Sequence, residues 1–277
     1  MLISTLLVSN NNQKDLELLL PSLELALKNL HLQLNEIYIE KYLSEILLVD
    51  NCSSDLTVEF VEKNFPDVVI TKNRKKMGYG ANQNQNIVKA EGKFILLINP
   101  DMVVPPDMFN IMIRFMEQNH YAGIATCKVC NIDGSCQYLN KREPAILDLF
   151  IRRFFSPRLI PVLPNKIESI VKTRLDLYEM RDTGYDKIMD VPFISGSFMF
   201  ARASVIKQLN GFDERFFMYF EDVDLCRRVR AIARSIYCPD VSVVHRWERA
   251  SHKSLKWTFI FALSGLKYFH KWGFRFT

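Results

Sequence analysis

The sequence has no apolar stretch long enough to cross a bilayer. A membrane-spanning helix needs about 20 consecutive apolar residues, and charged residues interrupt every candidate segment before that length. The N-terminus, MLISTLLVSNNNQKD, also lacks a basic region and a small-residue cleavage site, which argues against a secretory signal peptide. We therefore interpret it as a first strand and expect a cytoplasmic protein.

Low-complexity tracts and internal repeats are absent as well. Hydrophobic residues make up 48% of the 277 positions, which is too many for a disordered chain. The length suits one large domain, or one domain with a substantial tail. Six cysteines in such a chain fit reduced thiols. Cys127, Cys130 and Cys136 have part of a zinc-site spacing, but no nearby histidine supplies a fourth ligand, so we favour packed thiols.

The chain carries a formal net charge of +5, and its basic residues are concentrated in two regions. They alternate with apolar residues at 141–175 and again at 246–277. This pattern is typical of proteins that meet an anionic surface or a phosphate-bearing substrate. We expect no nucleic-acid partner, and the sequence leaves open whether the protein forms homo-oligomers.

The first half of the chain alternates short apolar segments with amphipathic ones. Strands are expected at 2–9, 46–50, 68–71 and 94–98, and helices at 13–34, 54–64, 80–90 and 107–118. Ser53 or Ser54 is the expected N-cap of the second helix. The alternation predicts an α/β fold with a Rossmann-like, mainly parallel central sheet flanked by helices. Ligands of such sheets bind beyond the carboxyl ends of the strands.

The second half is less regular. We expect a turn at 131–134, strands at 194–201 and 241–245, and helices at 221–233 and 255–271. Residues 141–190 receive no assignment.

Polar clusters follow three of the expected strands: Ser9-Asn10, Asp50-Asn51 and Asn99-Pro100-Asp101. Each alone suits a turn or a helix cap, but three at one edge of a sheet favour a shared site. Asp101 could hold a hard divalent cation, with Asn99 orienting it or a bound water. Asp50 could accept a hydrogen bond from a pyrimidine N–H or cap the next helix, and its local sequence does not decide between the two.

Two further motifs suggest chemistry. Gly78-Tyr79-Gly80, which leads to Asn84 and follows three basic residues, suits a phosphate at a helix start or a plain loop-to-helix junction. An aromatic run at 216–220 leads into Glu221, Asp222 and Asp224. Such acids favour a helix start, but aromatic walls would also raise a carboxyl pKa and improve a general base. We choose Asp222 as the base and name Glu221 beside it as a second catalytic residue.

The roles of Asp224 and His245 are predicted from the residues around them in the sequence. Asp224 is expected to be structural and paired with Arg227 or Arg228. His245 ends the last strand, where it is either a packed histidine or a second metal ligand.

Taken in order, these motifs resemble family 2 glycosyltransferases of the GT-A fold, particularly bacterial rhamnosyltransferases of O-antigen and cell-wall assembly. The matching segments are VDNCSSD, GYGANQN, INPD, FISGSFMFAR, NGFDERFFMYFEDVDLCRR and VVH, after a first strand ending in Ser9-Asn10. The resemblance implies an inverting transferase that uses Mg²⁺ or Mn²⁺ and a nucleotide sugar, with dTDP-L-rhamnose favoured. Asp50 would then contact the base, Asp101 and His245 the metal, and Asp222 would be the base catalyst. The donor site would comprise Ser9, Asn10, Asp50, Asn51, Gly78, Tyr79, Gly80, Asn84, Asn99 and Gly196.

The resemblance also implies an acceptor saccharide on polyprenyl diphosphate. Cationic, aromatic-rich stretches at 145–160 and 255–276 suit a peripheral position on the inner face of the cytoplasmic membrane, although a core-packing helix is the alternative. We expect a GT-A domain at 1–250, with a donor half at 1–128 and an acceptor half at 129–250, and an amphipathic tail at 251–277.

Two other functions remain to be distinguished. A nucleotidyltransferase would also be α/β and metal-dependent, but SNNNQKD lacks the Gly-rich basic loop expected after its first strand. A catalytically silent, membrane-associated scaffold would not need acids at each strand end.

Overall fold

The computed structural model describes residues 1–34, 44–154, 162–246 and 255–277. Part of the cationic stretch at 145–160 and the first residues of the expected tail at 251–277 therefore lie outside the described residues. Within the described ranges, no helix has both the length and the apolar character that a membrane span requires.

The first half of the chain forms the parallel part of the sheet, as predicted. Strands β1 (Ile3–Ser9), β2 (Ser44–Asp50), β3 (Val69–Lys72) and β4 (Phe94–Ile98) alternate with helices α1 (Gln13–Leu34), α2 (Thr57–Asn64) and α3 (Tyr79–Lys89). They lie in the order β3-β2-β1-β4, and each neighbouring pair is parallel. Ser9 is paired with Asp50 in this register, so the carboxyl ends of β1 and β2 coincide.

The second half completes a mixed sheet. Its strands are β5 (Met102–Val103), β6 (Ala122–Cys130), β7 (Met189–Asp190), β8 (Phe198–Arg202) and β9 (Arg234–His245). Strand β8 lies between β4 and β6 and is antiparallel to both. Strand β5 pairs with the end of β9, which places Met102 opposite His245. This pairing brings the segment after β4 to the end of the last strand.

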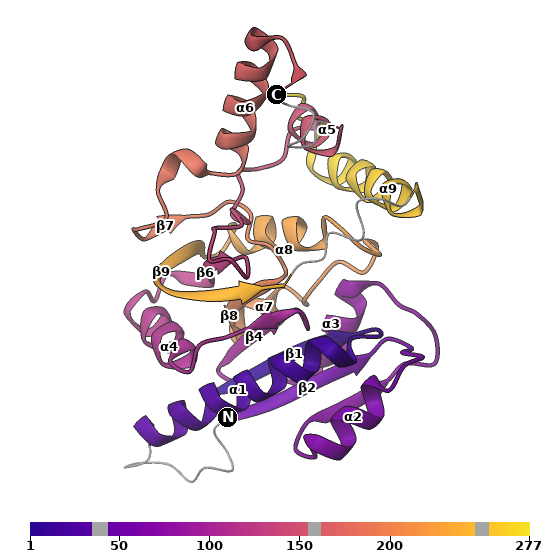
Figure 1. Cartoon of the computed structure of the whole chain (residues 1–277), viewed down its shortest axis with the longest axis vertical. Helices are drawn as coiled ribbons and strands as arrows, with labels where there is room; N and C mark the ends of the chain where they lie inside the picture. Colours follow the sequence, from indigo (N-terminus) through magenta and orange to yellow (C-terminus); the bar gives the residue numbers. More distant parts are fainter. Residues whose placement is uncertain (35–43, 155–161, 247–254) are drawn as a thin grey trace.

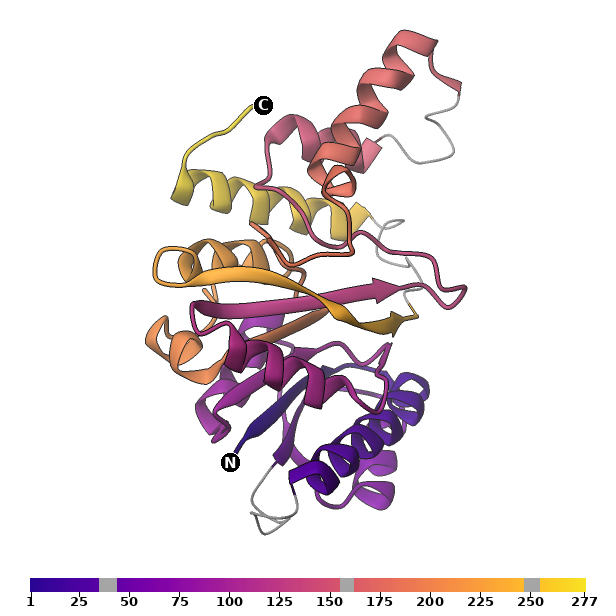
Figure 2. The same ribbon diagram turned by 90° about the vertical axis from the view of Figure 1, so that its left-hand side faces the viewer.

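Helices cover both faces of the sheet, which explains why the strands are uniformly apolar (Figures 1 and 2). On one face, α1, α2 and α4 (Met108–Gln118) share a buried core with one side of the strands. On the other face, α3, α7 (Ala203–Gln208) and α8 (Glu221–Val229) share a second core. Helix α9 (Leu255–Trp272) contributes the aromatic rings of Tyr268 and Phe269 to this second core.

The segment left unassigned from sequence forms a separate helical layer at one end of the molecule. It contains α5 (Ile146–Phe154), α6 (Asn165–Tyr178) and the short helix η3 (Arg181–Thr183). These elements lie with α9 at the end opposite the N-terminus (Figures 1 and 2). The backbone N–H groups of Ile146 and Leu147 donate to the carbonyls of Arg275 and Phe276, so the last residues are tied to the start of α5.

Several predicted boundaries were wrong for local reasons. Helix α2 begins at Thr57 and has no side-chain cap, so neither Ser53 nor Ser54 is its N-cap. The backbone N–H groups of these serines donate instead to Asp50 Oδ2 and Asn11 Oδ1. Helix α8 ends at Val229, and β9 begins earlier than predicted, at Arg234. Strand β8 begins only at Phe198, after the segment with Gly196 has turned toward α8.

Two other predictions are confirmed. The turn at 131–134 forms, with the Gly134 N–H donating to the Asn131 carbonyl at 3.0 Å. The cysteines are free thiols, and Cys127 and Cys130 are buried among the packed side chains.

Candidate active site

The ends of β1 and β2 form one polar group. The Asn51 N–H donates to the Ser9 carbonyl at 2.7 Å, and the Asn10 side chain donates to the carbonyls of Asn51 and Cys52 at 3.0 Å each. Asp50 is buried, and its Oδ2 accepts a hydrogen bond from the Ser53 N–H at 3.1 Å. Its Oδ1 and the Ser9 hydroxyl are buried without a hydrogen-bond partner among the described residues. Buried polar atoms without partners are costly, so a ligand that pairs with them would stabilise this region.

The glycines at the start of α3 serve packing within the protein. A Cβ at Gly78 would lie 2.7 Å from the Phe217 carbonyl oxygen, and one at Gly80 would lie 2.8 Å from Phe212 Cβ. The segment before α8 therefore approaches α3 too closely for any larger residue. Tyr79 extends from this junction toward the centre of the site, where its hydroxyl donates to the Gly196 carbonyl at 3.0 Å.

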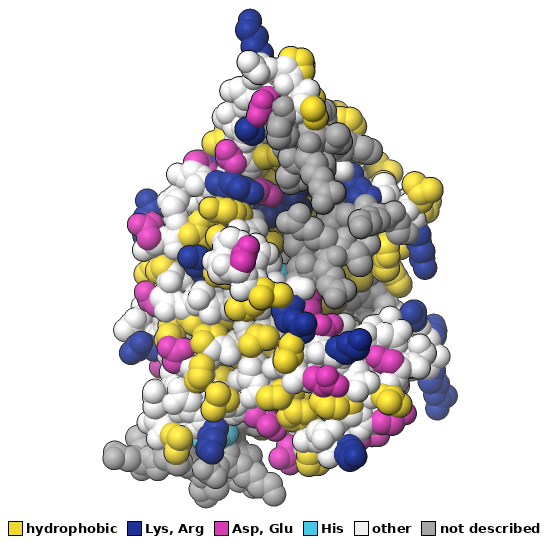
Figure 3. Space-filling model, in the orientation of Figure 1, with side chains coloured by type: hydrophobic (Ala, Val, Ile, Leu, Met, Phe, Trp, Pro, Cys, Tyr) yellow, Lys and Arg dark blue, Asp and Glu magenta, His cyan; other side chains and the backbone are white. Residues whose placement is uncertain are grey.

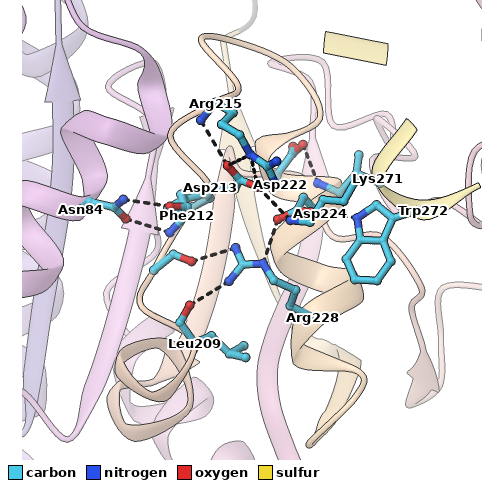
Figure 4. A network of polar contacts seen from close by, with 12 residues as sticks. Asn84, Leu209, Phe212, Asp213, Arg215, Asp222, Asp224, Arg228, Lys271 and Trp272 are labelled. Carbon is cyan, nitrogen blue, oxygen red and sulfur yellow. Dashed lines mark hydrogen bonds and ion pairs between the residues drawn. The ribbon is translucent and has the colours of Figure 1, made fainter. Parts of the chain in front are cut away.

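Asn84 lies one turn beyond Gly80 in α3 and bonds the backbone of Phe212, which Gly80 also approaches. Its side-chain oxygen accepts from the Phe212 N–H at 2.7 Å, and its amide donates to the Phe212 carbonyl at 2.9 Å (Figure 4). The structure therefore uses Asn84 to fix the segment before α8.

A cavity of about 320 Å³ lies beyond the ends of β4 and β9. Seven of the predicted site residues line it: Tyr79, Asn99, Asp101, Gly196, Glu221, Asp222 and His245. Ser9, Asn10, Asp50, Asn51, Gly78, Gly80 and Asn84 are outside its lining. The structure thus brings the candidate metal and catalytic residues together and leaves the β1–β2 group as a separate region.

Asp101 and His245 meet in this cavity because β5 pairs with the end of β9. His245 Nε2 lies 3.2 Å from Asp101 Oδ2. On the other side of the imidazole ring, Nδ1 lies 2.8 Å from Gln137 Oε1. The Gln137 amide donates to the His245 carbonyl and to Asn131 Oδ1, both at 2.8 Å, which fixes its oxygen toward the ring.

This arrangement fits a divalent cation. Because Gln137 presents an acceptor, Nδ1 is the nitrogen that carries the proton in neutral His245. Nε2 then faces Asp101 Oδ2, and an imidazole nitrogen and a carboxylate oxygen at this separation are suited to bind one cation together. The described residues hold no group of three or more His, Cys, Asp or Glu side chains arranged for a metal. Two protein ligands nevertheless suffice for Mg²⁺ and similar cations, which commonly complete their shell with water and substrate phosphates.

The start of α8 is held in a strained conformation. Tyr219 and Phe220 have φ values of 68° and 67°, in the left-handed region that costs a non-glycine residue about 1–3 kcal/mol. The two rings pack against Phe261 of α9, with centroid separations of 5.6 and 5.2 Å. Aromatic packing therefore stabilises the turn that delivers Glu221 and Asp222 to the cavity.

The two adjacent acids differ in their surroundings. The Asp222 carboxylate accepts hydrogen bonds from the Gly196 N–H at 3.0 Å and the Val223 N–H at 2.9 Å. Burial raises the pKa of Asp222, and these donors oppose the shift. Burial and the charge of Asp222 raise the pKa of Glu221 well above its usual range, and Glu221 Oε2 has no partner among the described residues. Asp222 is therefore the one that ionises first and can act as a base.

Asp224 is structural, as predicted, and pairs with Arg228. Its buried carboxylate contacts Arg228 Nε at 2.8 Å, Lys271 Nζ at 2.6 Å and the Trp272 indole N–H at 2.8 Å (Figure 4). These contacts join α8 to the last turn of α9 close to the candidate base.

Replacing Asp224 with alanine is expected to lower the free energy of unfolding by about 3–5 kcal/mol, because Arg228 and Lys271 would lose their buried counter-charge. Urea denaturation measures the change. Asp240→Ala, at an exposed carboxylate, is the matched control, and an equal effect of both variants would contradict a structural role for Asp224.

Sequence reasoning missed two polar residues. Gln137 orients His245, and Lys141 lines the cavity. Both follow the turn at 131–134 in a segment without helical or strand periodicity. The sequence pattern therefore could not indicate that these two side chains lie at the site.

Known proteins resemble this chain in sequence. The family model described as Glycosyl transferase family 2 matches residues 17–209. Rhamnosyltransferase WbbL of Escherichia coli (strain K12) is 29% identical over 177 residues, which cover 60% of this chain and 61% of that protein. The N-acetylglucosaminyl-diphospho-decaprenol L-rhamnosyltransferase of Mycobacterium tuberculosis (strain ATCC 25618 / H37Rv) is 28% identical over 214 residues, which cover 72% of this chain and 66% of that protein. The chain thus matches less than two thirds of the length of either relative.

Solved structures share the fold at low sequence identity. S. aureus TarS 1–349 in complex with UDP-GlcNAc has a TM-score of 0.60 at 18% identity, covering 97% of this chain and 67% of that one. GalNAc-T7 with UDP, GalNAc and Mn²⁺ has a TM-score of 0.61 at 13% identity, covering 89% of this chain and 43% of that one.

Proposed function

Because the chain belongs to glycosyl transferase family 2 and has the GT-A fold, we propose that it transfers a sugar from a nucleotide donor to an acceptor hydroxyl. One observation carries this proposal: a candidate base, Asp222, lines the same cavity as the candidate cation ligands Asp101 and His245. Transfer from a nucleotide sugar requires both a base for the acceptor hydroxyl and stabilisation of the leaving diphosphate.

The proposed donor is dTDP-L-rhamnose. The unpartnered Asp50 Oδ1 at the end of β2 suits the ring N–H of a thymine base, and Ser9 and Asn10 lie beside it. The names of both curated relatives, which are rhamnosyltransferases, support rhamnose as the sugar.

Mg²⁺ or Mn²⁺ would be held by Asp101 and His245, and would neutralise charge on the diphosphate when bound. In the proposed reaction, Asp222 removes the proton from the acceptor hydroxyl, whose oxygen forms a bond to the anomeric carbon. The bond from that carbon to the diphosphate oxygen breaks, and attack from the opposite side inverts the configuration. Burial and the charge of Asp222 raise the pKa of Glu221 well above its usual range, so in this proposal Glu221 stays protonated and Asp222 carries the negative charge.

The proposed acceptor is a saccharide on polyprenyl diphosphate, reached at the inner face of the cytoplasmic membrane. Helix α9 is apolar on its outer side, where Leu255, Phe259, Leu263 and Leu266 are exposed. Figure 3 shows hydrophobic and basic side chains along the edge of the molecule where α9 lies. The spacing of these residues forms one helix face that would enter a bilayer interface. The division into a donor half at 1–128, an acceptor half at 129–250 and a tail remains part of this proposal.

Replacing Phe259 and Leu263 together with glutamate is expected to reduce binding to vesicles containing anionic lipid by about 10-fold or more, because two apolar contacts with the interface are lost. Vesicle sedimentation measures the fraction of protein bound. Val88→Glu alters an apolar side chain exposed on α3 and is the control. Unchanged binding of the double variant would contradict docking through α9.

A panel of nucleotide sugars with a short-chain polyprenyl-diphospho-GlcNAc acceptor tests the function. We expect metal-dependent release of dTDP and an inverted rhamnosyl product. Release of pyrophosphate from a nucleoside triphosphate would instead support a nucleotidyltransferase. Absence of nucleotide binding with either cation would support a silent scaffold.

A further inference from the structure

A buried lysine in the cavity wall has no part in the reaction described above. Lys141 is 3% exposed and lines the cavity. Its backbone N–H and carbonyl pair with those of Phe193 at 3.0 Å each, which fixes it beside the segment that carries Gly196. Its ammonium group donates one hydrogen bond, to the Tyr138 carbonyl at 3.1 Å.

This ammonium group is incompletely paired. Among the described residues, no carboxylate lies within 4.0 Å of Lys141 Nζ, and burying a charge without such a partner is unfavourable. Burial, together with the nearby charges of Arg152 and Arg181, lowers the pKa of Lys141 to about 7, while Glu179 and Asp222 oppose the shift. An anionic ligand in the cavity would supply the missing counter-charge.

Two arginines add to the positive charge. Arg152 and Arg153 of α5 line the same cavity, and Arg153 also donates to the Thr258 hydroxyl of α9. Arg152 lies 3.5 Å from Glu179, but that carboxylate also pairs with Arg181 at 2.7 Å. Arg181 also lies 3.5 Å from Asp176, so two carboxylates balance Arg152 and Arg181. The charge that lacks a carboxylate within 4.0 Å among the described residues is therefore that of Lys141, and the two arginines of α5 lie beside it in the cavity lining.

We propose that Lys141, with Arg152 and Arg153, forms a subsite for a phosphate group carried by the acceptor. This inference rests on the proposed function. We favour the acceptor over the donor as the source of this phosphate, because the proposed site for the donor diphosphate is at Asp101 and His245. The three cations come instead from the segment after β6 and from α5. Helix α5 contacts α9, which is the proposed membrane face and therefore the side from which a lipid-linked acceptor would arrive. A phosphate between three cations would also hold the acceptor hydroxyl near Asp222.

The test compares two acceptors that carry the same saccharide, one on a short-chain polyprenyl diphosphate and one on an uncharged alkyl glycoside. For Lys141→Met we expect the ratio of their kcat/KM values to fall by about 10- to 100-fold, because charge-assisted hydrogen bonds to phosphate are lost. Lys141→Arg should restore much of this ratio. Lys187→Met removes an exposed charge elsewhere and should leave the ratio unchanged. Equal losses with both acceptors, or a loss confined to the donor KM, would overturn the proposal.

Calorimetry with the diphosphate acceptor alone gives a second measurement. Because the pKa of Lys141 is lowered to about 7, binding of an anion at pH 8 should take up more protons in the wild type than in Lys141→Arg. Equal proton uptake in both would overturn the proposal even if Lys141→Met fails to fold. Nucleotide binding with Mn²⁺, measured on the same preparations, separates this result from a failure of the proposed function.

Discussion

Asp222→Asn is expected to lower kcat by about 10²–10⁴-fold while leaving the affinity for the nucleotide donor nearly unchanged. Asparagine has the size of aspartate and can still accept the hydrogen bond from the Gly196 N–H, but it cannot take a proton from the acceptor hydroxyl. Steady-state kinetics and calorimetry with the donor measure the two quantities. Because burial raises the pKa of Asp222, the acidic limb of the wild-type rate profile should lie above the pH at which an ordinary aspartate titrates.

Glu221→Gln is the matched control for this experiment. A protonated carboxyl group and a carboxamide are both uncharged and similar in size, so most of the rate should remain. An Asp222→Asn variant as active as the wild type would remove Asp222 as the base, and a larger loss in Glu221→Gln would exchange the two roles.

Asp101→Ala is expected to abolish metal-dependent donor binding and to reduce the rate of transfer by about 10³-fold or more, because the carboxylate ligand of the cation is lost. Titration of Mn²⁺ with the nucleoside diphosphate measures binding directly. Gln137→Leu should have a smaller effect of about 10–100-fold on metal affinity, because it only releases the orientation of His245.

Asp107→Ala provides the control, since it removes an exposed carboxylate a short distance along the same segment. Metal binding that persists in Asp101→Ala would show that the cation is held elsewhere.

The parallel half of the sheet was predictable because its signals are local. Apolar strands and amphipathic helices alternate in the sequence, and each polar strand end follows its strand directly. The antiparallel insertion of β8 between β4 and β6 was not predictable, because the local pattern indicates a strand but neither its direction nor its neighbours in the sheet. Such long-range pairing leaves no mark in the local pattern.

The candidate site shows the same division. Asp101, Asp222 and His245 were predicted because acids and a histidine stand at element ends, where functional groups are expected, and the structure places all three in one cavity lining. Gln137 and Lys141 act through neighbours distant in sequence, at His245 and Phe193, and only the folded chain brings them together.

The contact of Asp224 with Lys271 and Trp272 has a consequence for biosynthesis. A ribosome makes α8 well before it makes the end of α9, and during that interval the aspartate two positions beyond the base has no lysine or indole beside it. The buried Asp224 carboxylate therefore gains these two partners only after residue 272 has left the exit tunnel and the last turn of α9 has docked on α8.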